Sequence, residues 1–263
     1  MTIESIDLQR VELSASGANE PGPVLPTRRA TPVRWPVMVQ RWTDVVFLHW
    51  RFDPGVVQAL LPGGVTVDTH DGSAWVGLVP FQMEGLGVPG LAPLPHVGRF
   101  PEVNVRTYVR AGRRRGVWFF SLDVDRLLPA VVARVAYHLP YCAGRAHHVR
   151  NSELVVSRVE RRWPRADDSP VSEIVVKTGA AVDPDDELIR FLTDRWGLIS
   201  STRRGGLRYA AVDHPAWSLH AAEVVHLADG LVAAAGLPAP HATPHVMWSP
   251  GVDVRVGRPQ RAI

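Results

Sequence analysis

The chain has 263 residues, a formal net charge of +3 and 46% hydrophobic residues. This length is sufficient for one domain with a substantial core, and the composition excludes a largely disordered or strongly basic protein. The 22 glycines, 23 prolines and 9 tryptophans favour a strand-rich fold with many turns.

The first part of the chain predicts a lead-in followed by strands and one short helix. Residues 1–34 are polar and proline-rich, and we expect them to form a flexible segment before a single domain at 35–263. A strand is expected near residues 40–52, then a helix with Asp53 as its N-cap and Pro54 in its first turn. His70-Asp71-Gly72 predicts a hairpin turn between two strands.

The rest of the chain predicts mainly antiparallel strands with few helices. A long loop is expected over residues 83–98, since this stretch is rich in glycine and proline. Helical spacing marks residues 127–138 and 186–198, where acidic residues fill the first turn of the second helix. Further expected elements are strands at 152–163 and 172–182, then more strands and a final helix. The fold class is therefore β-rich α+β.

The expected strand at residues 102–109 has two different faces. Glu102, Asn104, Arg106 and Tyr108 alternate with the residues Val103, Val105, Thr107 and Val109. The following strand is apolar on both faces from Val117 to Leu122, which is typical of a strand covered on both sides. The polar face therefore either lines an enclosed pocket that suits an anionic or carbonyl ligand, or is solvated, with Arg106 and Glu102 as an exposed pair.

Several segments resemble one known family, and the resemblance extends from about Trp35 to Val256. The chain resembles the YqjF-like uncharacterised family within the acetoacetate decarboxylase-like superfamily. This resemblance implies a strongly curved antiparallel sheet that closes into a barrel-like cone around a small-molecule pocket, with helices packed outside. The segments that carry it are VVFLHWRFDPGVVQALLPGGVTVDTHDG, AWVGLVPFQMEG, FPEVNVRTYV, GVWFFSLDVD, ARVAYHLPYCAG, FLTDRWGL and GVDVRVG.

The resemblance also implies which chemistry is missing. The name-giving enzyme uses a lysine that forms a Schiff base with its keto substrate, an example of an activated amine. That lysine follows a proline where this chain has Pro140-Tyr141, so tyrosine occupies the position of the nucleophile. Lys177, the only lysine, lies well downstream. Glu102 occupies the position of a pocket acid in the superfamily.

Two classes of function follow from these residues. The first is an enzyme that carries out enolisation, dehydration or hydrolysis on a small carbonyl or carboxylic-acid compound. In it, Glu102 acts as acid or base, Tyr141 donates a hydrogen bond, or a proton if a nearby cation lowers its pKa, and Arg106 anchors an anion. Asn104, His49 and Tyr108 complete the expected substrate-binding set. The second is a non-catalytic binding or sensor protein that uses the same residues, and a purely structural role is the third reading.

The remaining reactive residues predict no metal and no cofactor. The histidine pairs 147/148 and 241/245 lack a known zinc-ligand pattern, and glycine-rich nucleotide motifs are absent. Asp123 or Asp125 is expected to cap the following helix, and Cys142, the sole cysteine, is expected to be a buried small side chain.

The same features predict the compartment and the partners. A single cysteine, no secretory signal and no apolar run of roughly twenty residues favour a cytoplasmic protein without membrane or nucleic-acid partners. The superfamily resemblance adds the expectation of a homo-oligomer.

Overall fold

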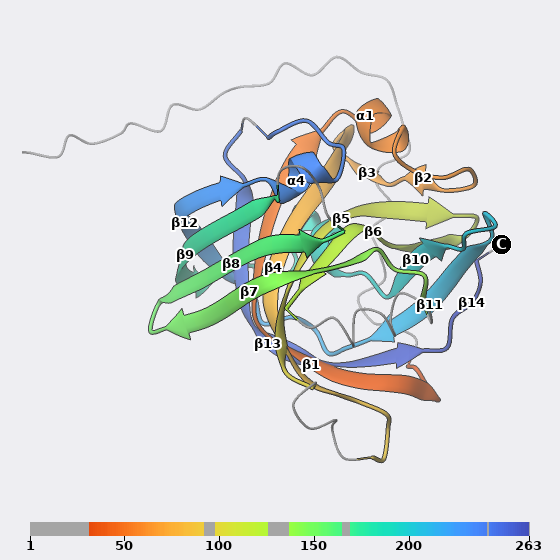
Figure 1. Ribbon diagram of the computed structural model, residues 1–263, viewed down its shortest axis with the longest axis horizontal. Coiled ribbons are helices and arrows are strands. Elements are labelled where there is room, and N and C mark those ends of the chain that lie inside the picture. Colours follow the sequence, from red (N-terminus) through yellow and green to blue (C-terminus); the bar gives the residue numbers. More distant parts are fainter. Residues whose placement is uncertain (1–31, 92–97, 126–136, 165–168, 241, 263) are drawn as a thin grey trace, which may run out of the picture.

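The computed structural model describes residues 32–91, 98–125, 137–164, 169–240 and 242–262 (Figure 1). Strands dominate these residues and helices are short. The helices are α1 (Pro54–Gln58), α3 (Glu187–Thr193) and α4 (Leu231–Ala234). The strands are β1 (Pro36–Phe52), β2 (Thr66–Val67), β3 (Thr69–His70), β4 (Ser73–Gly87), β5 (Phe100–Ala111), β6 (Arg114–Val124), β7 (Tyr141–Asn151), β8 (Leu154–Trp163), β9 (Val171–Ala181), β10 (Gly197–Ser201), β11 (Leu207–Asp213), β12 (His220–Asp229), β13 (His245–Gly257) and β14 (Gln260–Arg261).

These strands form one large curved sheet, as the family resemblance implies (Figure 1). Its hydrogen-bonded order is β14-β11-β10-β6-β7-β8-β9-β12-β13-β1-β4-β5-β2. Two additional pairings, β5 with β6 and β11 with β13, bring the order back on itself. Most pairs are antiparallel, but β6 pairs in parallel with both β7 and β10, which the expected antiparallel sheet did not include.

The strands β1, β4 and β5 form a wall between two interiors, because successive side chains of a strand point to opposite faces. We call the side that packs toward β8 and β9 the core face and the other side the pocket face. The core face carries Val46, Leu48, Val76, Leu78, Val103 and Val105, all nearly inaccessible to solvent. The pocket face carries Val45, Phe47, Val79, Phe81 and the polar residues of β5.

The helices occupy different places, and one of them corrects the expectation that all helices pack outside. Buried side chains of α1 and α4 join the apolar cluster of the core face. In contrast, α3 packs against the pocket face, where Phe191 lies 5.3 Å from the ring of Tyr108. Its N-cap is Asp186 and it ends at Thr193, and β10 begins soon afterwards at Gly197. It is therefore shorter than the helix expected at 186–198.

The local turn chemistry follows the sequence closely. The Asp53 carboxylate accepts hydrogen bonds from the backbone of Gly55 and Val56 at the start of α1, as predicted. Asp71 and Gly72 have φ values of 49° and 69°, which is the two-residue hairpin turn expected between β3 and β4.

Three other expectations have a different outcome. β4 continues to Gly87, so the loop expected at 83–98 begins later, and residues 92–97 within it lie outside the described residues. Most of the helix expected at 127–138 and nearly all of the flexible segment at 1–34 also lie outside them. The expected final helix is α4, which has only four residues.

Candidate active site

A pocket lies on the pocket face of the wall, between β1, β4, β5 and β6 on one side and the end of α3 on the other. It offers about 110 Å³ to water-sized molecules, several times what one buried water needs. Most of its lining is aliphatic or aromatic, and its polar side chains include Glu102, Asn104, Arg106, Tyr141 and Arg195. The reading of the Glu102 face as solvated is therefore wrong.

Among the described residues, Glu102 is the only carboxylic acid that lines this pocket. Its side chain is 2% exposed, and burial raises its pKa from 4.5 to about 8, with a contribution from nearby Asp123. Hydrogen bonds with Asn104 and Tyr141 act in the opposite direction and do not offset the burial. Its Oε2 atom has no hydrogen-bond partner among the described residues. Glu102 is thus mostly protonated at neutral pH and exchanges its proton near pH 8.

Tyr141 lies beside this acid because of the parallel pairing of β6 with β7. The first residue of β7, Tyr141, pairs with Leu122 of β6, and its hydroxyl forms a hydrogen bond with Glu102. Burial and the Glu102 charge raise the pKa of Tyr141 well above 10. The phenol therefore keeps its proton and serves as a hydrogen-bond donor, so the option of a lowered pKa at this position is wrong.

Arg106 lies in the pocket with little compensation for its charge. Its guanidinium carbon lies 5.5 Å from the ring centre of Phe47, and Nη2 donates a hydrogen bond to the Tyr108 hydroxyl over 3.4 Å. The Nε atom is buried without a partner, and Arg106 forms no ion pair within the part of the chain that the structure describes. An anion is the natural partner for such a group.

His49 and Tyr108 lie one layer behind Arg106. Tyr108 donates its hydroxyl proton to the Leu192 carbonyl over 2.8 Å, so His49 Nε2, 2.6 Å from the same hydroxyl, carries a proton and donates to it. Burial and the Arg106 charge lower the pKa of His49 well below 6.5, which keeps the ring neutral. Neither residue is part of the pocket lining. The sequence predicted that both bind substrate, whereas the structure places them as supports for Arg106 and α3.

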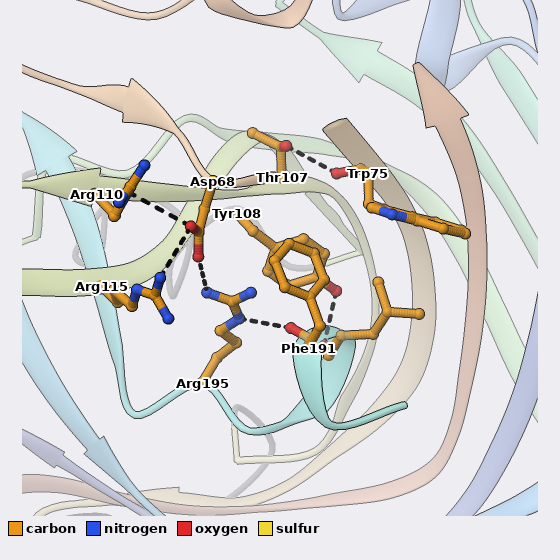
Figure 2. Close-up of polar contacts among 9 residues, drawn as sticks. Asp68, Trp75, Thr107, Tyr108, Arg110, Arg115, Phe191 and Arg195 are labelled. Carbon is orange, nitrogen blue, oxygen red and sulfur yellow. Dashed lines mark hydrogen bonds and ion pairs between the residues drawn. The ribbon is translucent and has the colours of Figure 1, made fainter. Parts of the chain in front are cut away.

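Arg195 is a polar residue of the pocket that the sequence reasoning missed. It is 6% exposed, and its Nη1 and Nε atoms donate to Asp68 over 2.8 Å and to the Phe191 carbonyl over 2.7 Å (Figure 2). Its Nη2 atom is buried and has no partner among the described residues. Local sequence signals do not reveal this residue, because its place in the pocket depends on α3 packing inside the sheet.

Aromatic residues form the wall of the pocket toward the surface. The rings of Trp42 and Trp217 stack at 6.0 Å, and His214 lies 5.0 Å from Trp217. Both indole nitrogens are buried without partners in the described ranges. His214 and Gln40 line the pocket and also border a wide outer groove, so this end is where the pocket approaches solvent.

The other candidates lie away from the pocket or have structural partners. Lys177 is exposed on β9 and lies 3.6 Å from Glu153. Asp123 binds Arg161 through two hydrogen bonds of 2.6 and 2.8 Å. The start of the helix that Asp123 or Asp125 is expected to cap lies outside the described residues. Cys142 is buried, as expected. Within the residues described, no three His, Cys, Asp or Glu side chains cluster as metal ligands, and no helix has the length and apolarity to cross a membrane.

Comparison with known proteins places this geometry in context. Residues 39–253 match the model of the DUF2071 family, described as an uncharacterized conserved protein. The uncharacterized protein YqjF of Bacillus subtilis (strain 168) is 32% identical over 220 residues, which cover 83% of this chain and 89% of YqjF.

Solved structures with a similar fold have much lower identity. An acetoacetate decarboxylase-like enzyme from Sphingomonas wittichii RW1 is 16% identical with a TM-score of 0.60, over 86% of this chain and 92% of that one. Acetoacetate decarboxylase from Legionella pneumophila is 14% identical with a TM-score of 0.61, over 95% and 98% of the two chains. The enduracididine biosynthesis enzyme MppR, complexed with pyruvate, is 14% identical with a TM-score of 0.59, over 90% and 98%.

Proposed function

Because the chain belongs to the DUF2071 family and has the acetoacetate decarboxylase-like fold, we propose that it binds a small carboxylic acid with a carbonyl group and transfers a proton on it without a covalent intermediate. The observation that carries this proposal is Glu102, an acid with a pKa of about 8 in an apolar pocket. Acids perturbed in this way are concentrated at functional sites.

Each polar group of the pocket has a role in this proposal. Arg106, which has no carboxylate partner, binds the carboxylate of the ligand. The Tyr141 hydroxyl keeps its proton and donates a hydrogen bond to the carbonyl oxygen, where negative charge develops as an enolate forms. The ionised form of Glu102, about half of the molecules near pH 8, takes the proton from the adjacent carbon and returns it. Enolisation consists of this proton transfer, dehydration begins with it and then releases the hydroxyl group as water, and hydrolysis instead uses Glu102 to take a proton from water.

The comparisons support a keto acid as the substrate class, and the position of the only lysine argues against a Schiff base. MppR, a structural neighbour, binds pyruvate, which carries both a carboxylate and a carbonyl group. The only lysine of this chain is exposed on β9, away from the pocket. The proposal therefore assigns the chemistry to Glu102 and Tyr141 alone.

Proton exchange on a simple keto acid tests this function directly. The purified protein is incubated with pyruvate in D₂O near pH 8, and loss of the methyl proton signal is followed by NMR. We expect exchange above the buffer rate, and a Glu102→Gln rate about 10²–10⁴ times lower. Glu153→Gln, which alters an exposed carboxylate, is the matched control and should retain the full rate. Equal rates in Glu102→Gln and wild type would remove Glu102 from the mechanism.

Binding without turnover is the second candidate function. The exposed position of Lys177 favours it, because the fold is retained here without a lysine in the pocket. A keto acid that raises the melting temperature of wild type but not of Arg106→Ala, and that shows no proton exchange, would identify the protein as a binder.

A further inference from the structure

We propose that the ligand of this pocket carries two negative charges, with one acidic group bound by Arg106 and the second by Arg195. This inference rests on the proposed function and specifies its substrate class as a keto acid with a second carboxylate. It concerns Arg195, whose side chain reaches the pocket from the segment just after α3.

The first argument is the geometry of Arg195. Two of its nitrogens are fixed, one by Asp68 and one by the Phe191 carbonyl, so the guanidinium plane cannot turn freely (Figure 2). Its carbon lies 4.6 Å from the ring centre of Tyr108 and 4.3 Å from that of Phe191. The third nitrogen, Nη2, has no partner among the described residues, although it is fully buried. A buried donor that a rigid scaffold leaves unpaired is costly unless a ligand binds it.

The second argument is the balance of charge. Asp68 binds Arg195 and also forms ion pairs with two other arginines (Figure 2). Its Oδ1 atom lies 3.5 Å from Nε of Arg110 and 3.5 Å from Nη2 of Arg115. One negative charge therefore faces three positive ones and does not neutralise Arg195 alone. Arg106 forms no ion pair with the described residues. Glu102 adds no compensating charge at neutral pH, because burial keeps it mostly protonated. The pocket thus holds more positive charge than one carboxylate offsets.

The third argument is that one residue positions both arginines. Arg106 donates to the hydroxyl of Tyr108, whereas Arg195 lies over its ring. Tyr108 is itself fixed by His49 and by the Leu192 carbonyl. Both guanidinium groups therefore contact the same fixed side chain, Tyr108, which holds them in place relative to each other. Two acidic groups of one small molecule can bind such a preorganised pair with little loss of entropy.

A matched pair of five-carbon keto acids tests the inference. 2-Oxoglutarate carries a second carboxylate where 2-oxopentanoate carries a methyl group. We expect 2-oxoglutarate to bind wild type at least about tenfold more tightly by calorimetry, as one charged hydrogen bond provides. Arg195→Gln should abolish this preference and leave the affinity for 2-oxopentanoate within about threefold of wild type.

Two further variants separate charge recognition from folding. Arg110→Gln removes another partner of Asp68 that lies outside the pocket lining, so the preference should persist. If Arg195→Gln does not fold, Arg195→Lys provides the test instead. It keeps the charge but loses the planar group, so we expect it to retain part of the preference for 2-oxoglutarate. Equal binding of both keto acids to wild type would overturn the inference and leave the proposed function standing. Failure of both to bind would contradict both proposals.

Discussion

The arginines on the two sides of the wall formed by β1, β4 and β5 differ in whether their nitrogens have hydrogen-bond partners. On the core face, Arg161 is satisfied by Asp123 and Ser121 through contacts of 2.6 to 2.9 Å. On the pocket face, Arg106 and Arg195 each keep a buried nitrogen without a partner in the described residues. The first arrangement needs nothing from outside the protein, whereas the second leaves two donors for the ligand that we propose.

The difference shows how one set of strands supports two purposes. Val103 and Asp123 are cross-strand partners on the core face, and their neighbours Glu102 and Val124 pair on the pocket face. A shift of register by one residue would exchange these sets and place the polar groups of the pocket in the apolar core. The core face therefore fixes the register on which the site depends.

The largest expected effect comes from breaking the satisfied ion pair. Asp123→Ala leaves the Arg161 charge buried without a partner, so we expect the free energy of unfolding to fall by about 3–5 kcal/mol. Urea denaturation measures this loss. Glu173→Ala removes the exposed Arg158–Glu173 pair and should cost less than about 1 kcal/mol. Similar losses in both variants would show that the buried pair has no special cost.

A smaller effect comes from the protonation of Glu102. Its pKa is about 8 in the folded chain and near 4.5 when exposed, so the folded state holds the proton more tightly. The resulting stability is full below about pH 4.5 and is lost as the pH rises to about 8. Between pH 5 and 8.5, wild type should lose a few kcal/mol more than Glu102→Gln in urea denaturation. Parallel pH profiles of the two proteins would contradict the raised pKa.

The smallest effect compares two buried valines across the wall. Val103→Ala on the core face should cost about 2 kcal/mol, since it leaves a cavity in a packed cluster, and should not change ligand affinity. Val79→Ala borders the pocket, so its stability cost should be smaller, while the affinity for keto acids should change. Denaturation measures the stability of both variants and calorimetry measures their affinity for keto acids. Equal stability losses together with equal changes in affinity would contradict the prediction.

Much of this organisation could be predicted from the sequence. The alternation at residues 102–109, the Asp53 cap and the Asp71-Gly72 turn depend on local chemistry, and all appear as expected. The family resemblance located Glu102 and Tyr141, which the structure brings together.

The missing parts depend on long-range packing. Arg195 enters the pocket only because α3 packs inside the sheet. Its partner Asp68 lies 127 positions earlier in the sequence. His49 and Tyr108 share the parity of the polar face, yet the long side chain of Arg106 reaches the pocket while theirs do not. No periodicity in the sequence distinguishes these cases.

The pairing of β1 with β13 has a consequence for how the protein is made. Val45 pairs with Ser249, about 200 residues later, so the first strand meets this neighbour only when the last long strand has been synthesised. At about 5–20 residues per second, a ribosome needs about 10–40 s to supply it. During that interval one edge of β1 is open to other chains. Completion of the sheet therefore comes late in synthesis, and chains that stall before β13 are prone to aggregate.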